Sequence, residues 1–391
     1  MNILINIPDI NKTNGGVYQY SIALLKILAK AKSTSQIFIY CNDPNEDILN
    51  IINSNRNFKL TNCSAPNYSL LTNLFFKAIN TFFNILKMKK GLKRKDIYDV
   101  IIKCYKIDII HSPLQKIVVK KNIKNISTMH DVQELYFPEF FTSEQRAYRA
   151  VNYKKAIDKA DAVIVSYDHI KKDIIKYFDK KESQVYTILL DMEDLWFTNI
   201  TKRDEKILNN YDLPKEFLLY PASTWEHKNH LMLLKAIKNI NNESINLVCT
   251  GHKTDYFTKE IEPFIISNKL ENKIKFLGIV SDFELFELYK SCKAVIVPTL
   301  YEAGSFPLME SILMSVPVIC SNTTSLPETI GNRSFVFDPF DVDDIINKIN
   351  KIWFDKVFIQ DNLELLKIQA EKLKNNNAFS KIYKVYEDLM N

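Results

Sequence analysis

The sequence predicts an α/β protein with two Rossmann-like, doubly wound halves. Short apolar runs alternate with longer amphipathic segments; for example, ILINI at residues 3–7 precedes a helix expected over residues 18–31. This alternation is typical of βαβ units in a parallel sheet. It begins again at residues 217–223, FLLYPAS, after a polar, turn-rich stretch at residues 191–214 that predicts a linker. The 391 residues are enough for two domains of ordinary size.

The expected elements follow in order along each half. In the first half we expect a helix over 144–159 and strands at 37–40, 109–112, 127–131, 162–166 and 186–190. In the second half we expect helices over 231–239, after Asp282 and over 306–314, and strands at 245–251, 273–278, 294–299 and 317–321. Residues 363–390 predict a final helix. The domains are therefore expected at 1–198, joined by the C-terminal helix at about 375–391, and at 199–374, facing a central cleft at the carboxyl ends of the strands.

Composition and charge exclude several classes of protein. With 46% hydrophobic and 12% aromatic residues, the chain is typical of a globular protein. A net charge of +6 is too small to indicate a nucleic-acid binder, although it suits anionic ligands or lipid headgroups. The six cysteines lie far apart without a C-x-x-C pair, so we expect neither a metal site nor a disulfide framework. The first residues lack a secretory signal pattern, so a cytoplasmic protein is expected.

Residues 70–95 have the composition of a basic amphipathic helix. A narrow polar stripe interrupts an otherwise apolar run and consists of Asn73, Lys77, Asn80, Asn84 and Lys87. Further basic residues follow as far as Lys95, with no acidic residue before Asp96. The stripe argues against a transmembrane helix. Two interpretations remain: a helix that lies peripherally on an anionic membrane, or a core-facing helix with a solvated basic end.

Residues that follow predicted strands of the first half are candidates for ligand binding. Gly15 and Gly16 lie between the first strand and its helix, where the backbone can approach a ligand, although a plain turn explains them equally. They do not form a G-x-G-x-x-G pattern, so no dinucleotide site is expected. His130 ends the strand STMHD and points toward the cleft; the alternative is a structural histidine. His111 is a similar, weaker candidate.

In the second half, Lys228 lies in a loop between a strand and a helix, with His227 and His230 beside it. A lysine at a helix start is electrostatically unfavourable unless an anion is present, because the helix dipole is already positive there. A bound phosphate would remove this conflict. The alternative is a solvated surface lysine.

The most informative stretch is PTLYEAGSFPLMESILMSVPVICSNTTSLPE at residues 298–328. Gly304 allows a tight turn, Ser305 is a good N-cap, and a proline suits the first helical turn. Free N–H groups of that turn would form an anion cradle. Glu302 in the loop and Glu310 on the helix can flank one ligand from two sides, unless both only complement the helix dipole.

Asp341, Val342 and Asp343 form a D-x-D pattern, which holds a metal ion in some enzymes. A three-residue pattern is frequent by chance, and this one follows FDPF and opens a predicted helix. We therefore interpret Asp341 as an N-cap and expect no metal there.

Residues 298–328 resemble the E-x7-E region of the GT-B glycosyltransferases, specifically the retaining family 4 type (glycosyl transferases group 1). The resemblance continues into the FDPFD that follows. Further matches occur in the family's order at the two glycines of the first loop, His130, Lys228 in H-K-N, VCTG and FLG. The resemblance thus covers most of the chain.

The resemblance implies a GT-B fold and a retaining, metal-independent sugar transfer without a cofactor. The donor would be a UDP- or GDP-linked sugar, and the acceptor a glycan or lipid-linked glycan in polysaccharide or glycoconjugate synthesis. Lys228 would bind the diphosphate, Glu302 the transferred sugar and Glu310 the nucleotide ribose, while His130 would sit beside the donor sugar. The implied catalytic residues are His130 and Glu302. The implied donor-binding residues are Gly15, Gly16, Lys228, Gly304, Ser305, Phe306, Leu308 and Glu310.

Two positions depart from the family pattern. Many relatives have an arginine six residues before the lysine, where this chain has Ala222. His227, His230 or a residue from elsewhere would have to replace that cation. The family's N-G-V-D is also absent, with LLDMEDLWF in its place. Two further functions therefore stand beside the enzyme: a non-catalytic GT-B partner subunit that binds nucleotide sugar, and a nucleotide-sugar epimerase. The presence of both glutamates favours the transferase.

Overall fold

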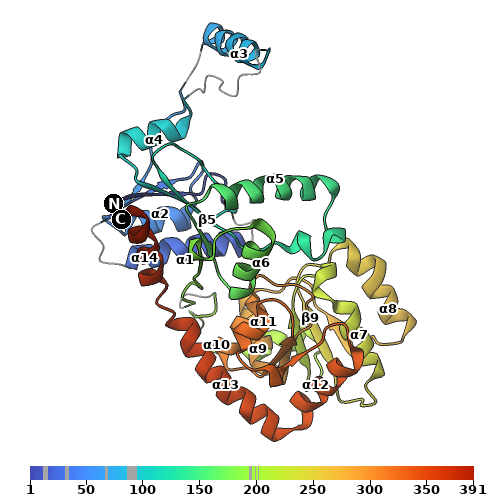
Figure 1. The fold of residues 1–391 in the computed structure, drawn as a ribbon. Coiled ribbons are helices and arrows are strands. Elements are labelled where there is room, and N and C mark those ends of the chain that lie inside the picture. The colour runs from blue at the N-terminus through green and yellow to red at the C-terminus, as the bar shows by residue number, and fades with distance from the viewer. Residues whose placement is uncertain are drawn as a thin grey trace. The chain divides into compact units, whose positions relative to one another are not determined.

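The computed structural model describes residues 1–11, 16–30, 35–66, 69–85, 95–192, 196–198, 200 and 202–391. Its strands form one seven-stranded and one six-stranded sheet, connected by helices (Figure 1). The chain divides into two compact units, the first made of 1–129, 152–164 and 382–391, the second of 130–151 and 165–381. The α/β class with two Rossmann-like sheets is therefore confirmed. The domain boundary at 198/199 stays a prediction.

The first sheet has the strand order β3-β2-β1-β4-β5-β6-β7. Strand β1 pairs in parallel with β2 and β4, and β5 pairs in parallel with β4 and β6. The strands are β1 (Asn2–Asn6), β2 (Gln36–Tyr40), β3 (Phe58–Leu60), β4 (Ile109–Ser112), β5 (Lys124–Thr128), β6 (Ala162–Val165) and β7 (Val185–Thr187). The helices are α1 (Gly16–Lys30), α2 (Glu46–Asn53), α3 (Leu70–Ile85), α4 (Ile97–Tyr105), α5 (Ser143–Lys159) and α6 (Asp168–Phe178), with 3-10 turns η2 (Gln133–Leu135), η3 (Pro138–Phe140) and η4 (Glu182–Gln184).

The second sheet has the order β10-β9-β8-β11-β12-β13, and all its strand pairs are parallel. Its strands are β8 (Leu218–Pro221), β9 (Leu247–Thr250), β10 (Ile274–Phe276), β11 (Ala294–Val297), β12 (Val318–Ser321) and β13 (Val336–Phe337). The helices of this half are α7 (His230–Asn239), α8 (Glu262–Ser267), α9 (Asp282–Ser291), α10 (Phe306–Met314), α11 (Leu326–Ile330), α12 (Val342–Phe354) and α13 (Lys356–Lys374). The last helix, α14 (Ala378–Met390), belongs to the first unit from Ile382 onward. Shorter turns are η5 (Glu205–Tyr211), η6 (Glu226–Lys228), η7 (Phe257–Ile261) and η8 (Arg333–Phe335).

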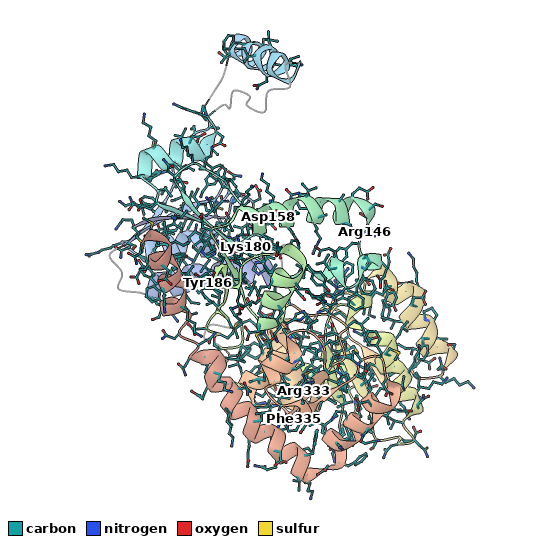
Figure 2. The ribbon with its side chains drawn as sticks, in the orientation of Figure 1. Arg146, Asp158, Lys180, Tyr186, Arg333 and Phe335 are labelled. Atoms are coloured by element: carbon teal, nitrogen blue, oxygen red, sulfur yellow. The ribbon has the colours of Figure 1, made fainter. Side chains whose placement is uncertain are left out.

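Both faces of the second sheet are covered by helices, which explains why its strands are almost purely apolar. Leu218 and Tyr220 pack with α7 and α12 on one face. Leu219, between them, packs with α9, α10 and α13 on the other. Phe335, labelled in Figure 2, enters this second core and lies 4.8 Å from the ring of Phe358. Ligands can therefore reach this sheet at its strand ends and not at its faces.

The C-terminal stretch differs from the single helix expected over residues 363–390. It forms α13 and α14, which are separated at residues 375–377 (Figure 1). Asn377 has a φ of 54°, in the left-handed region that asparagine tolerates better than most residues. The Asn376 side chain donates to the carbonyl of Leu189, and the N–H of Ala378 donates to Asp191 at 3.1 Å. At this break, bonds to residues far away in the sequence therefore replace the helical ones.

The described parts of the predicted linker at residues 191–214 pack against the second unit. It contains η5, and Leu208 in this turn is only 8% exposed. Trp196 and Phe197 are partly buried against the core that includes α9, α10 and α13. The stretch is therefore part of the second unit's packing.

The structure confirms a helix in the region of residues 70–88, as α3 (Leu70–Ile85). Two of its apolar side chains, Leu74 and Phe75, are 55% and 58% exposed. The basic residues at 87–94 lie outside the described residues. Within the ranges that the structure describes, no helix is both long and apolar enough to cross a membrane.

Candidate functional site at the carboxyl edge of the second sheet

Asn229 holds together three loops that follow strands of the second sheet. Its side-chain amide donates to the carbonyl of Pro298 at 3.0 Å and to that of Pro339 at 2.9 Å. These carbonyls belong to the loops after β11 and β13, whereas Asn229 ends the loop after β8. The N–H of Leu300 also donates to the carbonyl of His227 at 2.8 Å. The loops that carry Lys228 and Glu302 are therefore fixed against each other.

Lys228 and Glu302 form an ion pair between Nζ and Oε1. The two side chains are 18% and 11% exposed, so the pair is only partly solvated. The backbone around each residue is anchored. The hydroxyl of Tyr220 donates to the carbonyl of Lys228 at 2.8 Å, and that of Ser325 donates to the carbonyl of Glu302 at 2.9 Å. The structure thus brings together a cation and a carboxylate that lie 74 residues apart. An anionic ligand would compete with Glu302 for Lys228.

His227 and His230 do not supply the cation that is missing at Ala222. Burial, together with the nearby charge of Lys228, lowers the pKa of each imidazole to about 3. His230 is fully buried, and its ring lies 4.6 Å from that of Tyr220. Both histidines are therefore neutral near pH 7.

The helix α10 begins as predicted, at Phe306 after Ser305, but the expected side-chain cap is wrong. The Ser305 hydroxyl does not bond the first helical N–H groups, and its Oγ is buried without a hydrogen-bond partner among the described residues. Leu308, in the first turn, is fully buried. A Cβ at Gly304 would lie 3.1 Å from the ring of Tyr167, so this position has little room for a side chain. A buried hydroxyl and the first helical N–H groups therefore remain as donors at this end.

Glu310 lies about one helical turn after Phe306, the first residue of α10, and is almost completely buried. Its Oε1 accepts from the indole Nε1 of Trp196 at 2.6 Å, and its Oε2 accepts from the hydroxyl of Tyr289 at 2.7 Å. Burial raises the pKa of Glu310, although both hydrogen bonds lower it. Trp196 and Tyr289 are not among the site residues that the sequence predicts. Only the presence of a tryptophan within the polar stretch 191–214 could have drawn attention to the first.

His130 lies two residues beyond the end of β5 and is half-buried. Its neighbour Asp131 forms an ion pair with Arg149 at 2.8 Å. His111 is fully buried instead, with Nδ1 bonded to Tyr386 at 2.8 Å and Nε2 to Thr128 at 2.9 Å. Because these bonds occupy both ring nitrogens, His111 has a structural role.

The two glycines of the first loop belong to the first unit. Gly16 is the first residue of α1 and is exposed, whereas Gly15 lies outside the described residues. Asp341 caps α12 as predicted, since its Oδ1 accepts from the N–H groups of Asp343 at 2.9 Å and Asp344 at 3.3 Å. Among the described residues, no group of three or more His, Cys, Asp or Glu side chains is placed to hold a metal ion.

Comparisons with known proteins agree with this architecture. Residues 202–377 match the family model described as glycosyl transferases group 1. The O-antigen chain mannosyltransferase B of Escherichia coli is 27% identical over 224 residues, which is 56% of this chain and 58% of that protein. This match therefore spans less than two thirds of the relative's length.

Two solved structures have the same fold. A glycosyltransferase from Rickettsia africae ESF-5 has a TM-score of 0.69 at 17% identity and covers 100% of this chain and 98% of its own. Anabaena HepE in complex with UDP-glucose has a TM-score of 0.66 at 15% identity and covers 99% of this chain and 100% of its own. The chain thus has the GT-B fold.

Proposed function

We propose that the protein is a glycosyltransferase with a nucleotide-diphosphate sugar as its donor, because residues 202–377 match the family model of the glycosyl transferases group 1. The observation that carries the proposal is the ion pair of Lys228 and Glu302 on loops joined at the carboxyl edge of a parallel sheet. Parallel α/β sheets bind ligands at this edge. The start of α10 adds N–H donors and the buried Ser305 hydroxyl to it.

Each residue of this edge has a chemical task in the proposed reaction. Lys228 binds the donor diphosphate, while Glu302 holds hydroxyls of the transferred sugar and Glu310 those of the ribose. His130 sits beside the donor sugar. Further contacts to sugar and phosphate come from the start of α10, through Gly304, Ser305, Phe306 and Leu308. Donor binding by Gly15 and Gly16 stays a prediction from the sequence.

The proposed transfer retains the anomeric configuration. The acceptor hydroxyl attacks the anomeric carbon on the face from which the diphosphate leaves. The bond between that carbon and the diphosphate oxygen breaks, a bond to the acceptor oxygen forms, and the acceptor proton passes to the leaving diphosphate. Lys228 and the N–H groups of α10 stabilise the charge that develops on the diphosphate, which is the main requirement of such a reaction. No step requires a metal ion.

The proposed substrates are a hexose donor and a glycan or lipid-linked glycan acceptor in polysaccharide or glycoconjugate synthesis. A relative named as an O-antigen chain mannosyltransferase favours mannose as the transferred sugar. A structural neighbour that holds UDP-glucose favours testing UDP-linked donors as well. GDP-mannose and UDP-linked hexoses should therefore be compared directly.

A thermal-shift screen of these nucleotide sugars, followed by transfer and donor-hydrolysis assays, tests the proposal. A matching donor should raise the melting temperature through ligand linkage, and the same donor should be consumed. Transfer with an inverted anomeric centre would refute the retaining mechanism. Donor binding without transfer or hydrolysis would favour the non-catalytic partner subunit, which the absence of a second cation at Ala222 also supports. Isomerisation of the donor sugar without an acceptor would identify an epimerase.

We further propose that the protein acts at the cytoplasmic face of a membrane, with residues 70–95 bound to anionic lipid. The exposed Leu74 and Phe75 on α3 supply apolar contacts, and the basic residues that follow supply charge. Binding should weaken as salt rises, because screening acts over about 8 Å at physiological ionic strength.

Sedimentation with vesicles that contain anionic or only zwitterionic lipid tests this attachment. The wild type should sediment only with anionic vesicles, and a variant with glutamate in place of Lys89, Lys90, Lys93 and Lys95 should stay in the supernatant. A matched control changes four exposed lysines elsewhere in the first unit, Lys121, Lys154, Lys155 and Lys159. If wild type and the first variant both stay in the supernatant with anionic vesicles, the proposed attachment is refuted.

A further inference from the structure

A buried hydrogen bond joins the segment that carries His130 to the loop that carries Glu302. Tyr301 directly precedes Glu302, and its Oη accepts a hydrogen bond from the N–H of Val132 at 3.2 Å. Val132 lies two residues after His130. Tyr301 is 2% exposed and Val132 is fully buried, so water does not compete for this bond. One hydroxyl thus connects two segments that are 169 residues apart.

The ring of Tyr301 is held by side chains from η2–η3 and α6. Its centroid lies 5.6 Å from the ring of Tyr136 and 6.1 Å from that of His169. The Tyr136 hydroxyl donates to Asp173 Oδ1 at 2.6 Å, and His169 Nε2 lies 3.4 Å from Asp173 Oδ2. Burial raises the pKa of the Tyr301 phenol well above its usual value. Tyr301 therefore stays neutral, and its hydroxyl acts as a hydrogen-bonding group rather than as a base.

On the other side of the bond, α5 anchors the segment after β5 at both ends. Arg146, labelled in Figure 2, donates to the carbonyls of Pro138 at 2.8 Å and Phe141 at 2.7 Å. Arg149 pairs with the carboxylates of Asp131 and Glu134. Arg146 thus fixes the end of the segment at residues 138–141, and Arg149 fixes the side chains at 131 and 134. Between those two acidic residues, the N–H of Val132 donates to the Tyr301 hydroxyl.

We propose that Tyr301 is a positioning residue for sugar transfer, because its hydroxyl sets the spacing between His130 and Glu302. The inference rests on the proposed function, which places both residues beside the transferred sugar. Lys228 and Glu310, assigned to the nucleotide and its phosphates, do not contact this bond in the described structure. Loss of the hydroxyl should therefore affect the reacting sugar more than nucleotide binding.

The test compares Tyr301→Phe with Tyr211→Phe in the full-length protein. Both changes remove one phenol oxygen from the second unit. Tyr211 serves as the control because its hydroxyl donates to Glu284 on α9 and not to the segment that carries His130. Tyr301→Phe should lower kcat about tenfold, the effect of one lost hydrogen bond, while the donor KM and the affinity for the free nucleoside diphosphate stay within about twofold. Tyr211→Phe should keep wild-type kcat.

Hydrogen exchange of the Val132 amide provides a second measurement that does not depend on activity. In wild type this amide should exchange slowly, and in Tyr301→Phe it should exchange faster without a general loss of protection. Wild-type kcat in a folded Tyr301→Phe protein, or an equal change in KM and nucleotide affinity, would overturn the inference. If that variant does not fold, fast exchange of Val132 in wild type would overturn it and slow exchange would support it. A wild type that neither transfers nor hydrolyses any donor would instead refute the proposed function, whatever Val132 shows.

Discussion

Glu302 and Glu310 lie eight residues apart but in opposite environments. Glu302 is in a loop and pairs with the cation of Lys228. Glu310 is within a helix, where two neutral donors, the Trp196 indole and the Tyr289 hydroxyl, bind its carboxylate. Glu302 therefore pairs with a cation that a diphosphate could bind in its place. Glu310 is held by donors of the kind that ribose hydroxyls also provide.

In the proposed reaction, these two environments suit the two glutamates to different parts of the donor, Glu302 to the transferred sugar and Glu310 to the ribose. The interaction of a carboxylate with a neighbouring lysine depends on the charge of the ligand that the lysine binds. This interaction therefore differs between the bound donor and the transition state, in which charge develops on the diphosphate. In the proposed reaction, a carboxylate among neutral donors contacts the same ribose in the bound donor and in the transition state. The comparison therefore predicts that changes at the Lys228 end affect kcat and changes at the Glu310 end affect KM.

The largest effect is expected for Lys228→Ala, because under the proposed function the variant loses the cation that stabilises the leaving diphosphate. A charge-assisted hydrogen bond contributes about 1.5 to 3 kcal/mol, so kcat/KM should fall by roughly one to two decades. Lys235→Ala, which removes an exposed lysine from α7, is the matched control. Steady-state kinetics and a melting curve are the measurements. A folded Lys228→Ala protein with normal turnover would contradict the site assignment.

Glu302→Gln should lower kcat by tens of fold, since a donor sugar displaced by even ~1 Å can cost on the order of a hundredfold in rate. The donor KM should change little. A double variant with Lys228→Ala shows whether the two residues act together: non-additive effects are expected for a contacting pair. Full additivity would mean that the ion pair does not matter for transfer.

Glu310→Ala should mainly raise the apparent donor KM, by about tenfold, because a contact that is equal in ground and transition states is uniform binding. Trp196→Phe, which removes the indole N–H donor but keeps an aromatic ring, should raise KM by less. Donor is varied at saturating acceptor. If Glu310→Ala instead lost turnover at unchanged KM, while Glu302→Gln showed the reverse, the two roles would have to be exchanged.

The smallest expected effect is on the pH dependence of the free energy of unfolding, through the buried His230. The pKa of His230 is lowered to about 3 in the folded chain, whereas an unfolded histidine has a value of about 6.5. The unfolded state therefore binds a proton first, and the free energy of unfolding should fall by up to about 1.4 kcal/mol per pH unit below pH 6.5. His230→Phe should reduce this slope in denaturant titrations at pH 7, 6 and 5. An unchanged slope would show that His230 is already able to ionise.

Local signals allowed the sequence to predict α10 but not its partners. The Gly304, Ser305 and Pro307 run places the start at Phe306, and the helix ends at Met314 as expected. These signals act over a few residues. The bond from Trp196 to Glu310 spans 114 residues, and it depends on how the stretch at 191–214 packs. Likewise, the resemblance identified Lys228 and Glu302 separately, whereas their pairing follows from the order of β8 and β11 in the sheet.

Asn229 limits how this edge can diverge in evolution or be redesigned. Its backbone has a φ of 61°, and its amide serves carbonyls of two other loops. Glycine would keep the backbone angle but remove both donors, and aspartate would place a negative charge against two carbonyl oxygens. A graft intended to change donor preference should therefore transfer the loops after β8, β11 and β13 as one set, because Asn229 in the first loop bonds backbone carbonyls in both of the others.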